Sequence, residues 1–128
     1  MDVARVMAAG LAINRVAFGF NYVLRPESAG PSWIGRVANH PGAKVMTRSQ
    51  GVRDIALGTG ALAALARRDS TDARVWVAGH ALADATDFGV TWLMRERLPK
   101  RGARLALAVA GASTAIAAGA AAGIRRQR

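Results

Sequence analysis

The stretch WVAGHALADATDFGVTWLM, residues 76–94, decides the predicted fold of this chain. Steps of four and three residues along it connect four polar side chains, namely His80, Asp84, Asp87 and Thr91. Because an α-helix turns once every 3.6 residues, these side chains lie on one face of a helix. The other faces carry mainly Val, Ala, Leu, Phe and Gly. We therefore predict a helix that is apolar around most of its circumference and has one polar stripe.

Two tryptophans mark the ends of this helix. Trp76 and Trp92 are separated by roughly 24 Å at the helical rise of about 1.5 Å per residue. The hydrocarbon core of a bilayer is about 30 Å thick, and tryptophan is enriched at its two boundaries. The spacing therefore indicates a helix that crosses a membrane.

Three further apolar segments have the length of a membrane span. They cover residues 3–24, 45–66 and 105–124, and the organising helix covers residues 74–94. Segment 105–124 contains no charged residue, which is typical of a transmembrane helix. Alternation of β-branched residues with period two is absent, which argues against strands. We predict an all-α fold, with residues 1–128 forming one four-helix transmembrane up-down bundle; an alanine-rich soluble bundle is the alternative.

A long connection, residues 25–44, joins the first two segments and is interrupted by prolines and glycines. Within it, SWIGRVANH favours a short amphipathic helix lying on the membrane surface. Trp33, Ile34 and Val37 would then face the lipid.

The charges separate into two groups. The chain has a net charge of +10, and the termini and loops carry all of this excess. Basic loops beside apolar segments favour anionic membrane lipid as a partner. We expect no nucleic-acid partner, because no basic helix face with interleaved aromatic residues is present. The charges embedded in the apolar segments are three basic and three acidic residues: Arg15, Arg48, Arg53, Asp54, Asp84 and Asp87.

Embedded charges cost about 3 kcal/mol each at the centre of a spanning helix, so we expect them to pair inside the bundle. Such pairs either only hold the helices together or line a functional pocket. Buried ion pairs stabilise less than apolar packing of similar volume, which favours the pocket. We predict a ligand-binding polar centre, with Asp84, Asp87 and His80 as candidate acid–base groups. Its remaining predicted members are Asn14, Arg15, Arg48, Arg53 and Asp54.

The pair Asp84 and Asp87 also has D-x-x-D spacing, which can chelate a hard divalent ion such as Mg²⁺. Enzymes that use this motif carry further Asp or Asn residues on a second helix, and here only Asp54 is available. The chain has no Cys and no phosphate-binding loop. We therefore expect neither a metal nor a cofactor.

The sequence RSQGVRDIALG contains a G-x-R-D motif, Gly51 to Asp54, and Asp84 follows about thirty residues later. On these residues the chain resembles small four-helix membrane proteins of actinobacteria that are grouped as domains of unknown function. The resemblance covers about residues 5 to 124. It implies a membrane fold with a polar centre formed by Arg53, Asp54 and Asp84, and it implies no reaction.

The sequence thus predicts a multi-pass protein of the cell membrane that binds a small lipophilic molecule and isomerises or cyclises it if it is an enzyme. A small proton- or cation-coupled transporter, or a subunit of one, is the second interpretation. A structural membrane partner protein is the third. For a homodimer, we expect the contact to be the small-residue seam of the last segment, Gly111, Ala115, Gly119 and Gly123.

Overall fold

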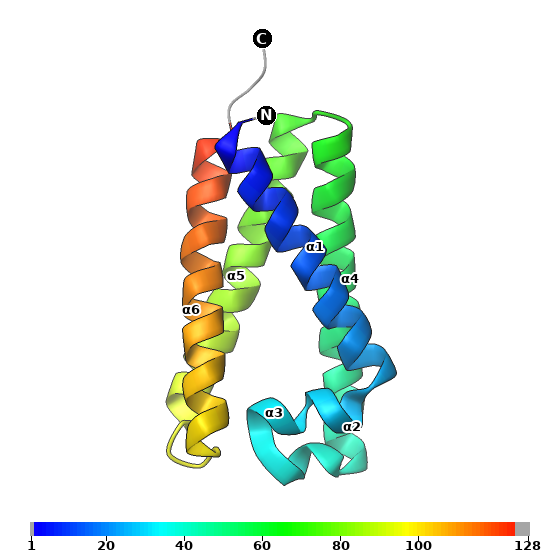
Figure 1. Cartoon of the computed structure of the whole chain (residues 1–128), viewed down its shortest axis with the longest axis vertical. Coiled ribbons are helices and arrows are strands. Elements are labelled where there is room, and N and C mark those ends of the chain that lie inside the picture. Colours follow the sequence, from blue (N-terminus) through cyan, green and yellow to red (C-terminus); the bar gives the residue numbers. More distant parts are fainter. Residues whose placement is uncertain (1, 125–128) are drawn as a thin grey trace.

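The protein is all-α in its computed structural model, which describes residues 2–124 (Figure 1). This agrees with the predicted class, and no strand occurs in the part of the chain that the structure describes. Between the first two long helices lie α2 (Pro26–Ala29), α3 (Pro31–Ile34) and the 3₁₀ helix η1 (Gly35–Asn39). The four long helices are α1 (Val3–Leu24), α4 (Pro41–Ala66), α5 (Ser70–Met94) and α6 (Lys100–Gly123).

The long helices alternate in direction, and the first helix crosses the others obliquely (Figure 1). Helix α1 packs along α4, and α5 packs along α6. We call the end that carries residues 25–40 and 95–99 the lower end, as it is drawn in Figure 1. The N-terminal end of α1 and the short turn between α4 and α5 lie at the opposite, upper end.

Three of the long helices begin four or five residues earlier than predicted. Helix α4 has Pro41 in its first turn, and α6 follows directly after Pro99. Proline is well tolerated at a helix start because the first backbone N–H groups have no intrahelical partner. Pro41 therefore begins a helix inside the predicted connection 25–44, and Pro99 directly precedes one. Helix α5 starts at Ser70 because the Asp69 carboxylate accepts hydrogen bonds from the backbone N–H groups of the first turn.

The helices approach one another closely because the core is built from small residues. The buried cluster consists mostly of alanine, contributed by all four long helices. A close crossing joins α1 to α4, where a Cβ atom on Gly19 would lie 2.6 Å from the backbone oxygen of Gly51. A Cβ atom on Gly51 would lie at the same distance from the backbone oxygen of Gly19. Only glycine at both positions permits this backbone contact.

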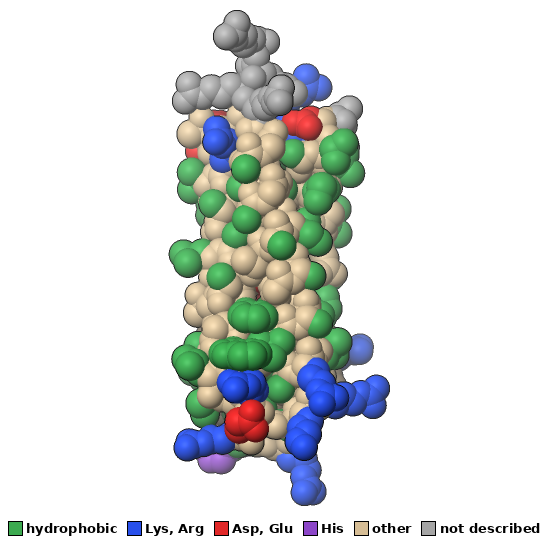
Figure 2. Space-filling model, turned by 90° about the vertical axis from the view of Figure 1, so that its left-hand side faces the viewer, with side chains coloured by type: hydrophobic (Ala, Val, Ile, Leu, Met, Phe, Trp, Pro, Cys, Tyr) green, Lys and Arg blue, Asp and Glu red, His purple; other side chains and the backbone are tan. Residues whose placement is uncertain are grey.

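Many large apolar side chains point outward, while several charged side chains are buried. Ile13, Leu82 and Leu93 are 60%, 71% and 78% exposed, whereas Arg15 and Asp84 are only 8% and 7% exposed. Figure 2 shows hydrophobic side chains along the middle of one face and Lys and Arg gathered at the lower end. Soluble proteins rarely combine a surface of this kind with buried charges.

Two helices, α1 and α6, are long and apolar enough to cross a membrane, with mean hydropathies of 1.3 and 1.8. The other two predicted spans, α4 and α5, do not reach this level within the described residues. The charges of α4 and α5 lower their hydropathy, and those in the middle of these helices point inward. The composition of α4 and α5 alone therefore does not identify them as spans.

Of the two tryptophans predicted to mark the membrane boundaries, one is placed as expected. Trp92 is half exposed, and the guanidinium carbon of Arg95 lies 4.2 Å from the centre of its ring, as suits an interfacial tryptophan. Trp76 instead packs against Gly60 of α4, where a Cβ atom would meet its indole ring at 2.5 Å. The small-residue seam of α6 is also divided, because Ala115 and Gly119 are exposed while its other members contact neighbouring helices.

Candidate functional site

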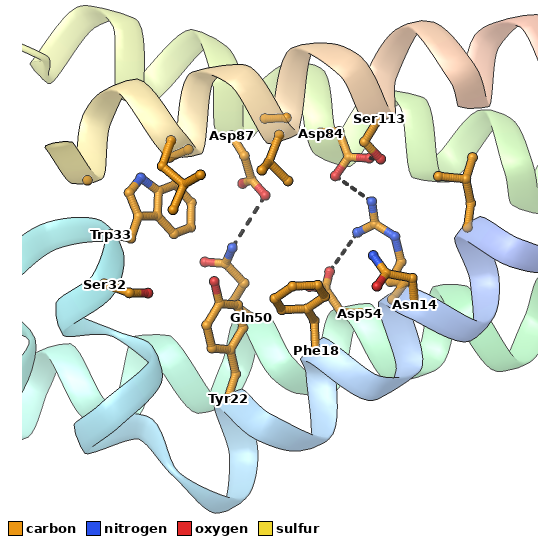
Figure 3. Close-up of a pocket in the computed structure, with 17 residues that line it drawn as sticks. Asn14, Phe18, Tyr22, Ser32, Trp33, Gln50, Asp54, Asp84, Asp87 and Ser113 are labelled. Atoms are coloured by element: carbon orange, nitrogen blue, oxygen red, sulfur yellow. Dashed lines mark hydrogen bonds and ion pairs between the residues drawn. The ribbon is translucent and has the colours of Figure 1, made fainter.

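The guanidinium of Arg15, on α1, lies between carboxylates of two other helices. Its Nη1 donates to Asp54 Oδ1 on α4 at 2.7 Å, and its Nη2 donates to Asp84 Oδ1 on α5. All three side chains are at most 10% exposed. Figure 3 shows Asp54 and Asp84 joined by dashed lines to this guanidinium. One arginine thus connects three helices at the centre of the molecule.

A second arginine extends this arrangement toward the lower end. Both η nitrogens of Arg53 donate to Asp87, at 3.3 Å and 2.9 Å, in the two-pronged geometry that guanidinium and carboxylate favour. Arg53 also contacts Asp54 Oδ1, through Nη2 at 3.2 Å and Nε at 3.3 Å. The same oxygen therefore accepts from both arginines. We call these five residues, Arg15, Arg53, Asp54, Asp84 and Asp87, the charged cluster.

Two uncharged side chains complete the hydrogen bonding of the cluster. The Ser113 hydroxyl of α6 donates to Asp84 Oδ2 at 2.5 Å, so the fourth long helix also contributes. The Gln50 amide donates to Asp87 Oδ2 at 3.3 Å, and Figure 3 shows these two side chains facing each other. Neither residue was predicted. Ser113 and Thr114 are the two most polar residues of segment 105–124, and this was the available signal.

Arg48, which was predicted to belong to the polar centre, lies outside it. Its side chain is exposed, and its Nε donates to the backbone carbonyl of Val23 at 3.2 Å. The last carbonyls of a helix lack intrahelical partners, so the end of α1 offers this arginine an acceptor. The cluster therefore contains two guanidiniums and three carboxylates, and with all five charged its formal charge is −1.

A cavity of about 330 Å³ lies beside the charged cluster, and Figure 3 shows the residues around it. We call it the central cavity. Its polar lining residues are Asn14, Arg15, Tyr22, Gln50, Asp54, Asp84, Asp87 and Ser113. Its apolar lining residues on α1 and α6 include Leu11, Phe18, Leu105, Ala106, Val109 and Ala110.

Three of the apolar lining residues reach the outer surface of α1 and α6. Phe18 on α1 is 48% exposed, and Leu105 and Val109 on α6 are 57% and 53% exposed. These side chains line the central cavity and also face the surroundings. The cavity therefore opens sideways, through the outward-facing apolar surface of the helices.

The short helix α3 closes the lower end of the central cavity. Its Trp33 indole N–H donates to the buried Thr91 hydroxyl of α5 at 3.1 Å. The backbone of α3 also packs on α6, since a Cβ atom on Gly102 would lie 2.5 Å from the Trp33 carbonyl oxygen. The predicted surface helix with Trp33 facing lipid is thus wrong for this side chain. The amphipathic pattern was interpreted as facing lipid, but the tryptophan finds a hydrogen-bond acceptor inside the molecule.

A second cavity of about 280 Å³ adjoins the first. Tyr22, Trp33 and Gln50 line both cavities. Its remaining walls are supplied by the short elements at the lower end and by the first turns of α4. These three side chains therefore separate two neighbouring spaces.

His80 is buried on the polar face of α5, one turn before Asp84, but it does not line the central cavity. It is 1% exposed, and within residues 2–124 neither ring nitrogen is hydrogen-bonded to another side chain. Asp84 accepts from Arg15 and Ser113 instead. His80 and Asp84, two of the candidate acid–base groups, are therefore not hydrogen-bonded to each other. Arg5, near the start of α1, is buried too and donates to Ser70 Oγ at 2.7 Å.

The carboxylates do not form a metal-binding arrangement. Asp84 and Asp87 pair with different guanidiniums rather than converging on one point. Across residues 2–124, no group of three His, Cys, Asp or Glu side chains is placed to hold a metal ion. The arrangement can instead hold a polar ligand group beside the carboxylates and an apolar group against α1 and α6.

Comparison with family models, curated proteins and solved structures finds no match to this chain. The resemblance to the small actinobacterial membrane proteins therefore stays a prediction. The residues on which it depends, Arg53, Asp54 and Asp84, all belong to the charged cluster.

Proposed function

We propose that the protein is a multi-pass protein of the cell membrane and that its central cavity binds a small lipophilic molecule. One observation carries the proposal: exposed apolar side chains of α1 and α6 and buried charged side chains line the same cavity. A membrane-soluble molecule would reach such a cavity sideways, from the lipid, without crossing water.

The membrane part of the proposal rests on where apolar and charged groups lie. Large apolar side chains cover the outside of the long helices, and the charges in the middle of these helices face inward. At about 1.5 Å per residue, α1 and α6 are roughly 33 Å and 36 Å long, enough for a hydrocarbon core of about 30 Å. Helices α4 and α5 would cross beside them, because their charges pair inside the bundle and need no contact with lipid.

The size of the cavity limits the ligand. Liquid water occupies about 30 Å³ per molecule, so 330 Å³ holds roughly eleven groups of that size. A ligand with about ten non-hydrogen atoms in the cavity fits this volume, as does the end of a longer chain whose remainder lies in the lipid. If the protein transforms its ligand, Asp84 and Asp87 are the acid–base candidates that line the cavity.

A transport function is the second candidate, and the adjoining second cavity favours it. Displacement of Tyr22, Trp33 or Gln50 would connect the two cavities and give a path from the cluster toward the lower end. In that case the three carboxylates would carry a cation or proton along this path.

Ligand capture tests the binding proposal directly. The protein is extracted with its surrounding lipid in a polymer that forms discs, and the extracted small molecules are identified by mass spectrometry. Ala106→Phe fills the cavity, whereas Ala108→Phe, two residues away on the exposed side of α6, adds the same group outside it. The proposal predicts a molecule that is enriched with the wild-type protein and with Ala108→Phe and is lost with Ala106→Phe. Equal lipid profiles for all three proteins would contradict it.

A further inference from the structure

We propose that the central cavity selects molecules with a positively charged head, such as an alkylammonium, on an apolar tail. This inference rests on the proposed function, because it names the ligand class of the same cavity. It depends on three features of the cavity wall: its charge, one unpaired carboxylate oxygen and its aromatic side chains.

The first feature is the charge balance. The cavity wall contains three carboxylates, Asp54, Asp84 and Asp87, and one guanidinium, that of Arg15. The second guanidinium of the cluster, Arg53, contacts two of these carboxylates but does not line the cavity. Even with both arginines counted, one negative charge is left over. A cationic head would balance it, while an anionic head would meet three carboxylates.

The second feature is an acceptor without a donor. Asp54 is 6% exposed and lines the cavity. Its Oδ1 accepts from both arginines, whereas its Oδ2 accepts no hydrogen bond from any described residue. The other two carboxylates differ, because both oxygens of Asp84 and both of Asp87 have donors. Asp54 Oδ2 is therefore the oxygen that an ammonium N–H can reach without displacing an existing partner.

The third feature is aromatic. Phe18, Tyr22 and Trp33 line the cavity together with the carboxylates. Aromatic faces attract ammonium groups, and the attraction is larger where water is excluded. Aromatic rings beside surplus negative charge thus favour a cation over a neutral polar head.

Three probes of equal chain length test this inference. They are octylammonium, octanol and octanoate, whose heads are cationic, neutral and anionic. Each is titrated calorimetrically into wild-type protein in nanodiscs of zwitterionic phosphatidylcholine, and empty nanodiscs correct for partitioning into lipid. A charge-assisted hydrogen bond predicts that octylammonium binds roughly tenfold or more tightly than octanol, and that octanoate binds most weakly.

Two variants test whether Asp54 is the source of the selectivity. Asp54→Asn removes the surplus charge, and Glu27→Gln removes one acidic charge from an exposed position outside the cavity. We expect Asp54→Asn to lose the preference for octylammonium over octanol and Glu27→Gln to retain it. If Asp54→Asn does not fold, the relative affinities of the wild-type protein for the three probes still test the charge selectivity.

The outcomes separate the two proposals. Octanol binding as tight as octylammonium binding, or tighter binding of octanoate, overturns the charge selectivity and leaves the cavity as a lipophilic site. Octylammonium selectivity that persists in folded Asp54→Asn also overturns it. Absence of binding by all three probes overturns this inference together with the proposed function.

Discussion

Arg15 Nη1 lies 2.7 Å from Asp54 Oδ1, although the two residues are 39 positions apart and both are buried. The same guanidinium also pairs with Asp84, so a single side chain of α1 holds α4 and α5. Arg53 also pairs with two acids, but its side chain is 35% exposed and that of Arg15 only 8%, so removal of Arg15 leaves the more deeply buried uncompensated charge.

Replacement of Arg15 tests this dependence. Arg15→Met keeps an apolar side chain of similar length but leaves Asp54 with Arg53 alone and Asp84 with Ser113 alone. Breaking a buried ion pair from one side typically costs about 3–5 kcal/mol. We expect a loss of this size in the free energy of unfolding, measured by titration with denaturing detergent in mixed micelles.

Arg48→Met is the matched control for that variant, because Arg48 is exposed and pairs with no acid. Its expected effect is within about 0.5 kcal/mol. Equal losses for the two variants would show that the central ion pairs do not distinguish Arg15 from a surface arginine.

The crossing of α1 and α4 predicts that replacing glycine by alanine has different effects on stability at two positions of α1. Gly19→Ala would place a Cβ atom 2.6 Å from the Gly51 backbone oxygen, whereas Gly10 has no atom within 4 Å of a new Cβ. Gly19→Ala should therefore destabilise by about 1–3 kcal/mol. Gly10→Ala should be neutral or stabilise by up to about 1 kcal/mol, because alanine favours the helix. Unfolding titrations of both variants decide, and stabilisation by Gly19→Ala would contradict the close crossing.

The membrane setting predicts a dependence on depth along α5. Leu82, near the middle of the helix, is 71% exposed, and Val75, near its upper end, is 67% exposed. An arginine at the centre of a spanning helix costs about 2.5–3.5 kcal/mol, while near the boundary it reaches the headgroups. We expect Leu82→Arg to reduce the fraction of protein retained in alkali-washed membranes and Val75→Arg to leave it unchanged. In a water-soluble protein, both surface substitutions would be tolerated equally.

The hydroxyl of Ser113 gives a further test of the cluster. Ser113→Ala removes a donor from Asp84 Oδ2, whereas the Thr114 hydroxyl donates to the backbone carbonyl of Ala110 within its own helix. Loss of a donor to a buried carboxylate costs about 1–3 kcal/mol. Ser113→Ala should therefore lower the free energy of unfolding by this amount, and Thr114→Ala by clearly less. Unfolding titrations that rank the two variants in the reverse order would contradict the hydrogen bond.

Helical spacing was enough to predict the polar face of α5. His80, Asp84 and Thr91 are buried there, because the 3.6-residue repeat is a local property of the chain. The cost of isolated charge in an apolar segment also indicated that embedded arginines and acids would meet. Arg15 and Arg53 do contact the three acids.

Other features could not be predicted, because they depend on how the helices are placed relative to one another. Arg48 has the same residue type and lies on the same helix as Arg53, but it faces the end of α1. Gln50, Ser113 and Trp33 are not charged, so no energetic argument from sequence assigned them to the cluster or the cavity wall. The partners of Arg15 and Arg53 determine the charge balance, and this balance required the structure.

The most direct test of the central claim is the depth of Ile13, which is 60% exposed and two residues from Arg15. The chain has no native Cys, so a spin label on Ile13→Cys reports one position in a lipid bilayer. A label on Val37→Cys at the lower end is the reference. If the cluster lies at membrane depth, oxygen relaxes the Ile13 label strongly and a water-soluble nickel complex does not, while the nickel complex relaxes the Val37 label. Strong relaxation of the Ile13 label by the nickel complex would contradict the account.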